Sequence, residues 1–134
     1  MHSTNYTNAF IEVADDCKAA RGTPPPDKQP ATIGRLQFDM LHGHPYRYTS
    51  DDVVFGVHAA RHGLREEELE TQRAAFFSKG QPCLRTSPLT KQYGWGVHCD
   101  GDGKVALVPR ESAEYERLRN DPALTHVKAM KASR

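Results

Sequence analysis

The stretch from Tyr93 to Val108 constrains the fold of this chain more than any other segment. Its first half alternates apolar or aromatic side chains with glycine and histidine: Tyr93, Trp95, Val97 and Cys99 against Gly94, Gly96 and His98. This period of two is typical of a β-strand. Residues 100–103, Asp-Gly-Asp-Gly, then tolerate the positive φ angles of a tight turn, and a second apolar stretch follows. The sequence therefore predicts an antiparallel hairpin over about residues 93–108.

Two further segments have strand character, and an irregular segment follows the first of them. Residues 9–14 carry aromatic and β-branched side chains, and residues 125–130 form a short stretch that can add a last strand. Residues 21–30 contain Gly22 and four prolines, which favour extended backbone without regular hydrogen bonds. We interpret this Pro-rich segment as a surface loop.

Two helices are expected between the Pro-rich segment and the middle of the chain. Thr32 is a candidate N-cap for an amphipathic helix that ends near Gly43. Ser50 is a candidate N-cap for a second helix over residues 51–62, which begins with two acids where they favour the helix dipole. The β-branched run at 53–57 leaves a strand open for the same residues.

Two more helices complete the predicted elements. Residues 65–78 are rich in Glu, Ala and Arg and predict the clearest helix, and Ser112 is a candidate N-cap for a short one that ends before Pro122. The element order lacks regular alternation of strand and helix. It predicts the α+β class: a small single domain over residues 1–134, with an antiparallel sheet packed by three or four helices.

Length, charge and cysteine content limit what the protein can be. A chain of 134 residues suits one domain. With 18 Lys and Arg against 17 Asp and Glu, the net charge of +1 gives no field that would hold nucleic acid. The N-terminus lacks an export signal, and no apolar run approaches the roughly 18–20 residues that span a membrane. Three cysteines, an odd number, suit reduced thiols, so we expect a cytoplasmic protein that binds no membrane.

The segment 79–98 concentrates cations, hydroxyls, a thiol and aromatic rings, and is the predicted site. Its candidate residues for binding a small anionic ligand are Arg85, Ser87, Lys91, Tyr93, Trp95 and His98. A guanidinium, a hydroxyl and an ammonium suit a phosphate or carboxylate. The structural alternative is that the cations pair with neighbouring acids, the hydroxyls satisfy turn amides and the aromatic rings lie in the core.

Cys83 opens an alternative function as the nucleophile of a Cys/His-dependent enzyme, with His98 as its partner. A small buried thiol is the structural alternative. The histidine pairs His58/His62 and His42/His44 have spacings compatible with metal ligands, but no cysteine pair or glutamate completes such a site, and we expect no metal. The sequence leaves the cofactor unknown.

The chain resembles, along nearly its whole length, a family of small bacterial proteins known only as a domain of unknown function. The motifs that carry the resemblance are residues 4–6 and 10–14, PYRYTSDDV at 45–53, FFSKGQPCLR at 76–85, SPLTK at 87–91, YGWGVH at 93–98 and VKAM at 127–130. The chain departs at Gln92, where the family tends to have arginine, and in the extra proline of 24–26. The resemblance implies a bacterial, single-domain protein and supplies no catalytic residues.

A third class of function is an interaction protein. A homodimer through an apolar face or a hairpin edge would belong to it, and the basic residues Lys128, Lys131 and Arg134 could contact a partner or nucleic acid. The sequence therefore leaves open a binding module for a small anion, a Cys/His enzyme and a homodimeric interaction module.

Overall fold

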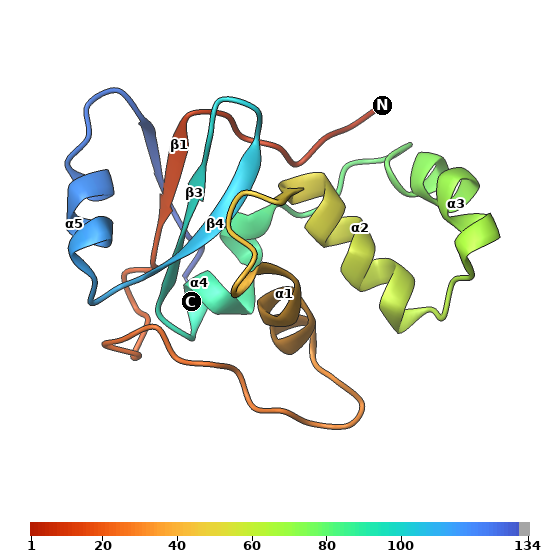
Figure 1. Cartoon of the computed structure of the whole chain (residues 1–134), viewed down its shortest axis with the longest axis horizontal. Coiled ribbons are helices and arrows are strands. Elements are labelled where there is room, and N and C mark those ends of the chain that lie inside the picture. Colours follow the sequence, from red (N-terminus) through yellow and green to blue (C-terminus); the bar gives the residue numbers. More distant parts are fainter. Residues whose placement is uncertain (132–134) are drawn as a thin grey trace.

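A computed structural model describes residues 1–131 of the chain. Five strands form one mixed sheet in the order β2-β4-β3-β1-β5. Helices α1, α2 and α4 cover one face of the sheet, α5 covers the other, and α3 lies on the far side of α2 (Figure 1). The strands are β1 (Ala9–Glu12), β2 (Tyr48–Thr49), β3 (Trp95–Cys99), β4 (Lys104–Pro109) and β5 (Thr125–Lys128). The helices are α1 (Ile33–Leu41), α2 (Ser50–Arg61), α3 (Leu69–Phe76), α4 (Pro88–Lys91) and α5 (Ala113–Arg119).

The predicted hairpin is confirmed. β3 and β4 pair antiparallel, with Val97 opposite Leu107. In the turn between them, the Asp100 carboxylate accepts hydrogen bonds from the backbone N–H of Asp102 and of Lys104, at 2.9 and 2.8 Å. A short polar side chain thereby closes the turn locally, which is why this element was readable from the sequence.

The α+β class is confirmed, and the sheet is mixed. Three of its four pairings are antiparallel, whereas β1 pairs with β5 in parallel, Phe10 lying opposite His126. The chain leaves β4, crosses the sheet through α5 and returns beside β1, and this path fixes the direction of β5. The structure has five α-helices in its described part, one more than the predicted maximum, because α4 forms a single turn within the predicted loop. None of these helices is long and apolar enough to cross a membrane.

Local capping defines the starts of α1 and α2. Thr32 accepts a hydrogen bond from the backbone of Arg35, as expected. The prediction that Ser50 caps the second helix is wrong: Thr49 is the N-cap and forms a capping box with Asp52, at 3.1 and 3.0 Å. Ser50 is instead buried, because its hydroxyl bonds with that of Thr4 at 2.8 Å. The two-way capping box favours the helix over the alternative strand.

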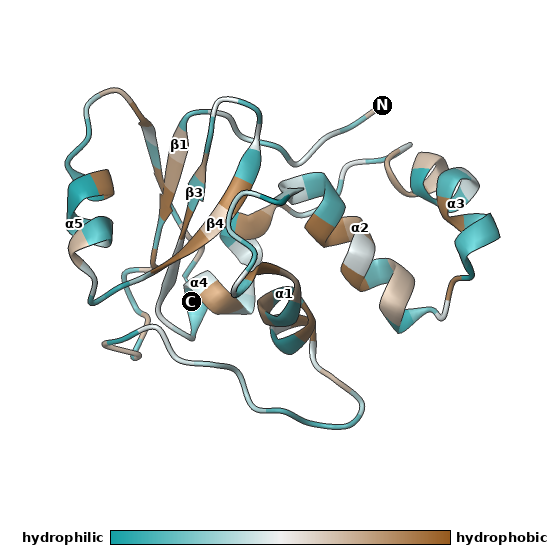
Figure 2. Cartoon of the chain, viewed as in Figure 1, coloured by the Kyte–Doolittle hydropathy of each residue, from teal (hydrophilic) through white to brown (hydrophobic). Residues whose placement is uncertain are grey.

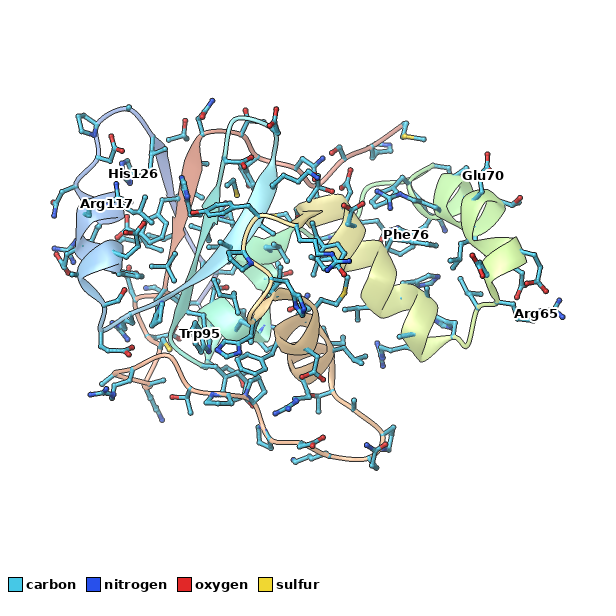
Figure 3. The ribbon with its side chains drawn as sticks, in the orientation of Figure 1. Arg65, Glu70, Phe76, Trp95, Arg117 and His126 are labelled. Carbon is cyan, nitrogen blue, oxygen red and sulfur yellow. The ribbon has the colours of Figure 1, made fainter. Side chains whose placement is uncertain are left out.

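The helix predicted over 65–78 is shorter and interrupted. A 3₁₀ turn at Glu66–Glu68 precedes α3, which buries none of its own residues. The Phe76 side chain lies between α3 and α2 (Figure 3), within 5.7 Å of the Phe55 ring. α3 thus packs on α2 and contributes no residue to either hydrophobic core.

Two hydrophobic cores lie on opposite faces of the sheet. Odd-numbered residues of β1 and β3 face α1, α2 and α4, whereas Phe10 and Val108 face α5. Figure 2 shows the apolar residues gathered along β1 and β4. Gly96 leaves room for α5 to pack, because a Cβ there would lie 2.8 Å from Tyr115 and 2.9 Å from Phe10.

The Pro-rich segment has no regular secondary structure and lies against the end of β3 (Figure 1). The Trp95 indole donates to the Thr23 carbonyl at 2.8 Å, and the Thr23 amide donates to the Tyr93 carbonyl at 2.8 Å. Pro25 is fully buried, while its proline neighbours are exposed. The segment is therefore a surface loop that covers one edge of the core.

Candidate functional site

A pocket of about 350 Å³ lies between α1, α2 and the segment that runs from Gln81 to Pro88. We call it the Cys83 pocket. Its apolar wall consists of Ile33, Val54, Val57, Phe76, Pro82 and Pro88, and its polar wall consists of Gln37, His58, Arg61, His62, Gln81, Cys83, Thr86 and Ser87. Among residues 1–131, no aspartate or glutamate lines it. The titratable groups of the pocket are therefore a guanidinium, two imidazoles and a thiol.

The Gln37–Ser87 pair forms the most buried polar part of the pocket. Gln37 on α1 is 6% exposed and Ser87, the N-cap of α4, is 3% exposed. The Ser87 hydroxyl donates to the Gln37 carbonyl oxygen at 2.5 Å and accepts from the Leu89 amide at 3.1 Å. The carbonyl side of the Gln37 amide is thus satisfied, whereas no residue of 1–131 accepts a hydrogen bond from its Nε2. Gln37 therefore offers unused donors to the pocket.

The cationic side of the pocket comes from the last turns of α2. The His58 and His62 rings lie 4.3 Å apart, as their four-residue spacing predicts, and His58 also packs on Phe76 at 4.5 Å. Burial, followed by the neighbouring His62, lowers the pKa of His58. Arg61 is exposed and has no hydrogen-bond or ion-pair partner within the described chain. Arg61 is thus the permanent charge of the pocket, whereas the lowered pKa keeps His58 neutral at pH 7 until a neighbouring anion favours its protonated form.

Cys83 joins the pocket from the segment between α3 and α4. Its thiol lies 3.6 Å from the Tyr6 hydroxyl, and its side chain is half-buried. The hydrogen bond with Cys83, followed by burial, raises the pKa of Tyr6. Tyr6 is therefore protonated at neutral pH, with its hydroxyl next to the sulfur.

Of the six residues predicted to bind an anion, Ser87 is the one that lines this pocket. Arg85 turns to the other end of the segment, where its Nε donates to the Lys128 carbonyl at 2.7 Å and its own carbonyl accepts from Met130. Arg85 thereby adds two hydrogen bonds to the end of β5, which also pairs with β1. Lys91 ends α4, apart from the residues that line the pocket.

The aromatic members of the predicted site belong to the core and to the opposite face. Trp95 is 6% exposed and packs 5.8 Å from the Phe38 ring, and Figure 3 shows it near α1. Tyr93 is half-buried against the same core. His98 points to the α5 face of the sheet, where its Nδ1 lies 2.7 Å from the Tyr46 hydroxyl. The structure thus places His98 and Trp95 on opposite faces of the same strand, β3.

Cys83 lines the Cys83 pocket, whereas His98 lies on the α5 face of the sheet. The histidines that share the pocket with Cys83 are His58 and His62. In the described chain, no three His, Cys, Asp or Glu side chains form a group that could hold a metal ion. His42 stacks on Phe38 at 4.6 Å instead. Sequence spacing identified the His58/His62 pair but gave no reason to join it to Cys83, because α2 and the 81–88 segment meet only through tertiary packing.

Arg61 and Gln37 were missed by sequence reasoning. An unpaired arginine near a helix C-terminus looks like an ordinary solvated side chain. Gln37 occupies the core-facing side of an amphipathic helix, and a polar residue at such a position is the one signal that could have indicated it.

A larger groove of about 600 Å³ lies between α2 and α3. Its lining includes Arg73, whose guanidinium lies 2.9 Å from the Asp52 carboxylate. Arg73 and Phe55 are also in cation–π contact at 5.8 Å. Because this arginine is already engaged, the groove offers a weaker case for anion binding than the Cys83 pocket.

The fold and the pocket define a small α+β protein with a five-stranded mixed sheet and, between α1, α2 and the 81–88 segment, a pocket with cationic and without acidic lining residues in the described chain. The chain belongs to the family of unknown function DUF6157, whose model matches residues 1–134. No curated protein and no solved structure matches the chain significantly.

Proposed function

We propose that this protein binds a small anionic molecule in the Cys83 pocket. The observation that supports the proposal most directly is Arg61, a guanidinium that has no partner within residues 1–131 and lines a pocket without acidic residues. An arginine in such a setting matches the planar geometry of a carboxylate or phosphate.

Other groups of the pocket suit the same ligand. Gln37 supplies N–H donors that can bond to anionic oxygens. An anion next to His58 would favour its protonated form and so add a second charge. The apolar wall and the volume of about 350 Å³ suit a metabolite with a short carbon skeleton.

The proposal keeps the ligand class expected from the sequence and moves the site. Ser87 is common to the predicted and the proposed site. For the other five residues a role in anion binding stays a prediction, because they do not line the Cys83 pocket: Arg85, Lys91, Tyr93, Trp95 and His98. The three free cysteines support a reducing, cytoplasmic setting. Neither a homodimer nor a nucleic-acid partner is part of the proposal, and Arg134 of the basic tail lies outside the described residues.

A thermal-shift panel tests the proposal. Inorganic phosphate, phosphorylated sugars and di- and tricarboxylates are added to the wild type, to Arg61→Gln and to Arg119→Gln. Arg119 is a matched control because it is exposed on α5 and lies on the opposite side of the sheet. We expect at least one anion to raise the melting temperature of the wild type and of Arg119→Gln, and to have little effect on Arg61→Gln. A panel in which no anion stabilises the wild type, or in which Arg61→Gln responds equally, would contradict the proposal.

A further inference from the structure

α3 is incompletely packed in a single copy of the chain. It has eight residues, none of them buried, and it contributes no side chain to either hydrophobic core of the described residues. Its contacts with α2 include the ring pair Phe76–Phe55 and the ion pair Arg73–Asp52, and it forms the outermost layer beside α2 (Figure 1). Helices this short are marginal in water unless an apolar face packs on a partner. α3 therefore has packing surface to spare.

The surface left unfilled is the α2–α3 groove, the space of about 600 Å³ between these two helices. Most of its lining is apolar: Met40, Tyr48, Phe55, Gly56, Ala59 and Leu69. Gly56 lets Met40 lie directly on α2, because a Cβ at residue 56 would lie 2.8 Å from the methyl carbon of Met40. The groove thus offers an apolar floor on which another helix can pack.

The charges of residues 66–79, which we call the α3 segment, are separated along its length. Its acids are Glu66, Glu67, Glu68 and Glu70, and its bases are Arg73 and Lys79. Arg65 pairs with Glu67 and Glu68, at 3.4 and 3.3 Å. Three charges of the segment have no ion pair within residues 1–131: Glu66, Glu70 and Lys79. The helix dipole favours acids before bases, but it leaves these three charges without a partner.

We propose that the α3 segment and the α2–α3 groove form the interface of a homodimer. The two α3 helices lie antiparallel about a twofold axis, and each covers the groove of the other copy. This arrangement is isologous, so the acidic start of each α3 segment lies beside the basic end of the other. A parallel arrangement would instead place like charges together.

A second copy suits this surface because it supplies both kinds of complementarity at once. Its acids meet the unpaired Lys79 and also Arg47, an exposed groove residue whose guanidinium contacts Tyr48 at 5.7 Å and has no ion pair within residues 1–131. Leu69 and the apolar floor are covered in both copies by the same contact. The interface goes beyond the proposed function, since the groove and the Cys83 pocket share no lining residue among residues 1–131.

Sedimentation velocity on the full chain gives the first test. We expect the wild type to form a species of twice the mass of one chain at concentrations up to about 100 µM. Raising the salt from about 0.05 M to about 0.5 M should weaken the dimer about tenfold, because exposed ion pairs are screened. A wild type that stays monomeric under all these conditions would overturn the inference and leave the groove to another occupant.

Two charge-reversed variants test the antiparallel arrangement. The basic variant carries Glu66→Lys and Glu70→Lys, and the acidic variant carries Arg47→Glu and Lys79→Glu; all four side chains are exposed. Each variant alone should be monomeric, since its interface then holds mainly one sign of charge. An equal mixture of the two should form a heterodimer. Circular dichroism and melting temperature show whether each variant keeps the fold.

The matched control carries Glu114→Lys and Glu116→Lys. Both side chains are exposed on α5, on the other side of the sheet, and their reversal changes the net charge as much as the basic variant does. We expect this control to dimerise like the wild type. Dimers that survive in the basic and acidic variants, a mixture without heterodimer, or a control that is monomeric would each place the interface elsewhere and overturn the inference.

Discussion

Ser87→Ala tests the reasoning about the candidate site most directly, because Ser87 makes two buried hydrogen bonds. Its hydroxyl caps α4 through the Leu89 amide and donates to Gln37 at 2.5 Å. Loss of an N-cap costs about 1 kcal/mol, and leaving a buried partner unsatisfied costs about 1–3 kcal/mol. We expect the variant to lose about 3 kcal/mol of unfolding free energy, which corresponds to a melting temperature lower by about 9–15 °C for a domain of this size.

The assay is urea unfolding followed by circular dichroism, with an unchanged m value as evidence that the folded state is intact. Thr86→Ala is the control, because its exposed hydroxyl donates to the Cys83 carbonyl at 2.8 Å and its loss should cost under about 1 kcal/mol. Gln37→Met completes a double-mutant cycle, in which the pair should show a coupling of about 1–2 kcal/mol. A loss below about 1 kcal/mol for Ser87→Ala, or additive effects in the cycle, would refute the claim that this pair holds the pocket together.

Three further predictions follow from particular contacts. Gly94→Ala should destabilise the fold by at least about 3 kcal/mol in chemical denaturation, because Gly94 has φ +77° and a Cβ would lie 2.4 Å from the Arg21 carbonyl oxygen. Lowering the pH from about 8 to about 6 should tighten anion binding in a thermal-shift titration, since an anion favours protonated His58, and His58→Gln should flatten this dependence. Without the anion, the effect of pH on stability has the opposite sign. The pKa of His58 is lower in the folded chain, so the unfolded chain takes up the proton first, and protonation of His58 lowers the free energy of unfolding as pH falls through its ordinary pKa of 6.5. Tyr46→Phe should cost about 1 kcal/mol in urea unfolding by losing the hydrogen bond to His98. Burial lowers the pKa of His98, and an NMR titration that shows an ordinary pKa for His98 in the wild type would contradict this burial.

The sequence by itself determined the elements whose signals are local. The hairpin follows from a period of two and from an Asp-Gly turn whose aspartate closes it within four residues. Thr32 and Ser112 act on amides three residues away, so their capping roles were visible in the chain. The failure at Ser50 is also instructive, because the neighbouring Thr49 has the same chemistry and only the buried contact of Ser50 with Thr4 distinguishes them.

Only the tertiary structure decided which polar residues meet. Ser87 and Gln37 are 50 residues apart, and Cys83 and Tyr6 are 77 apart, so neither pairing leaves a local pattern. The predicted site grouped residues by nearness in the chain, but successive residues of a strand point to opposite faces, which sends His98 away from the core that holds Trp95. The pocket exists because α1, α2 and the 81–88 segment pack together, and the parallel β5 exists because α5 crosses the sheet. Both depend on long-range packing energy that no short window of sequence contains.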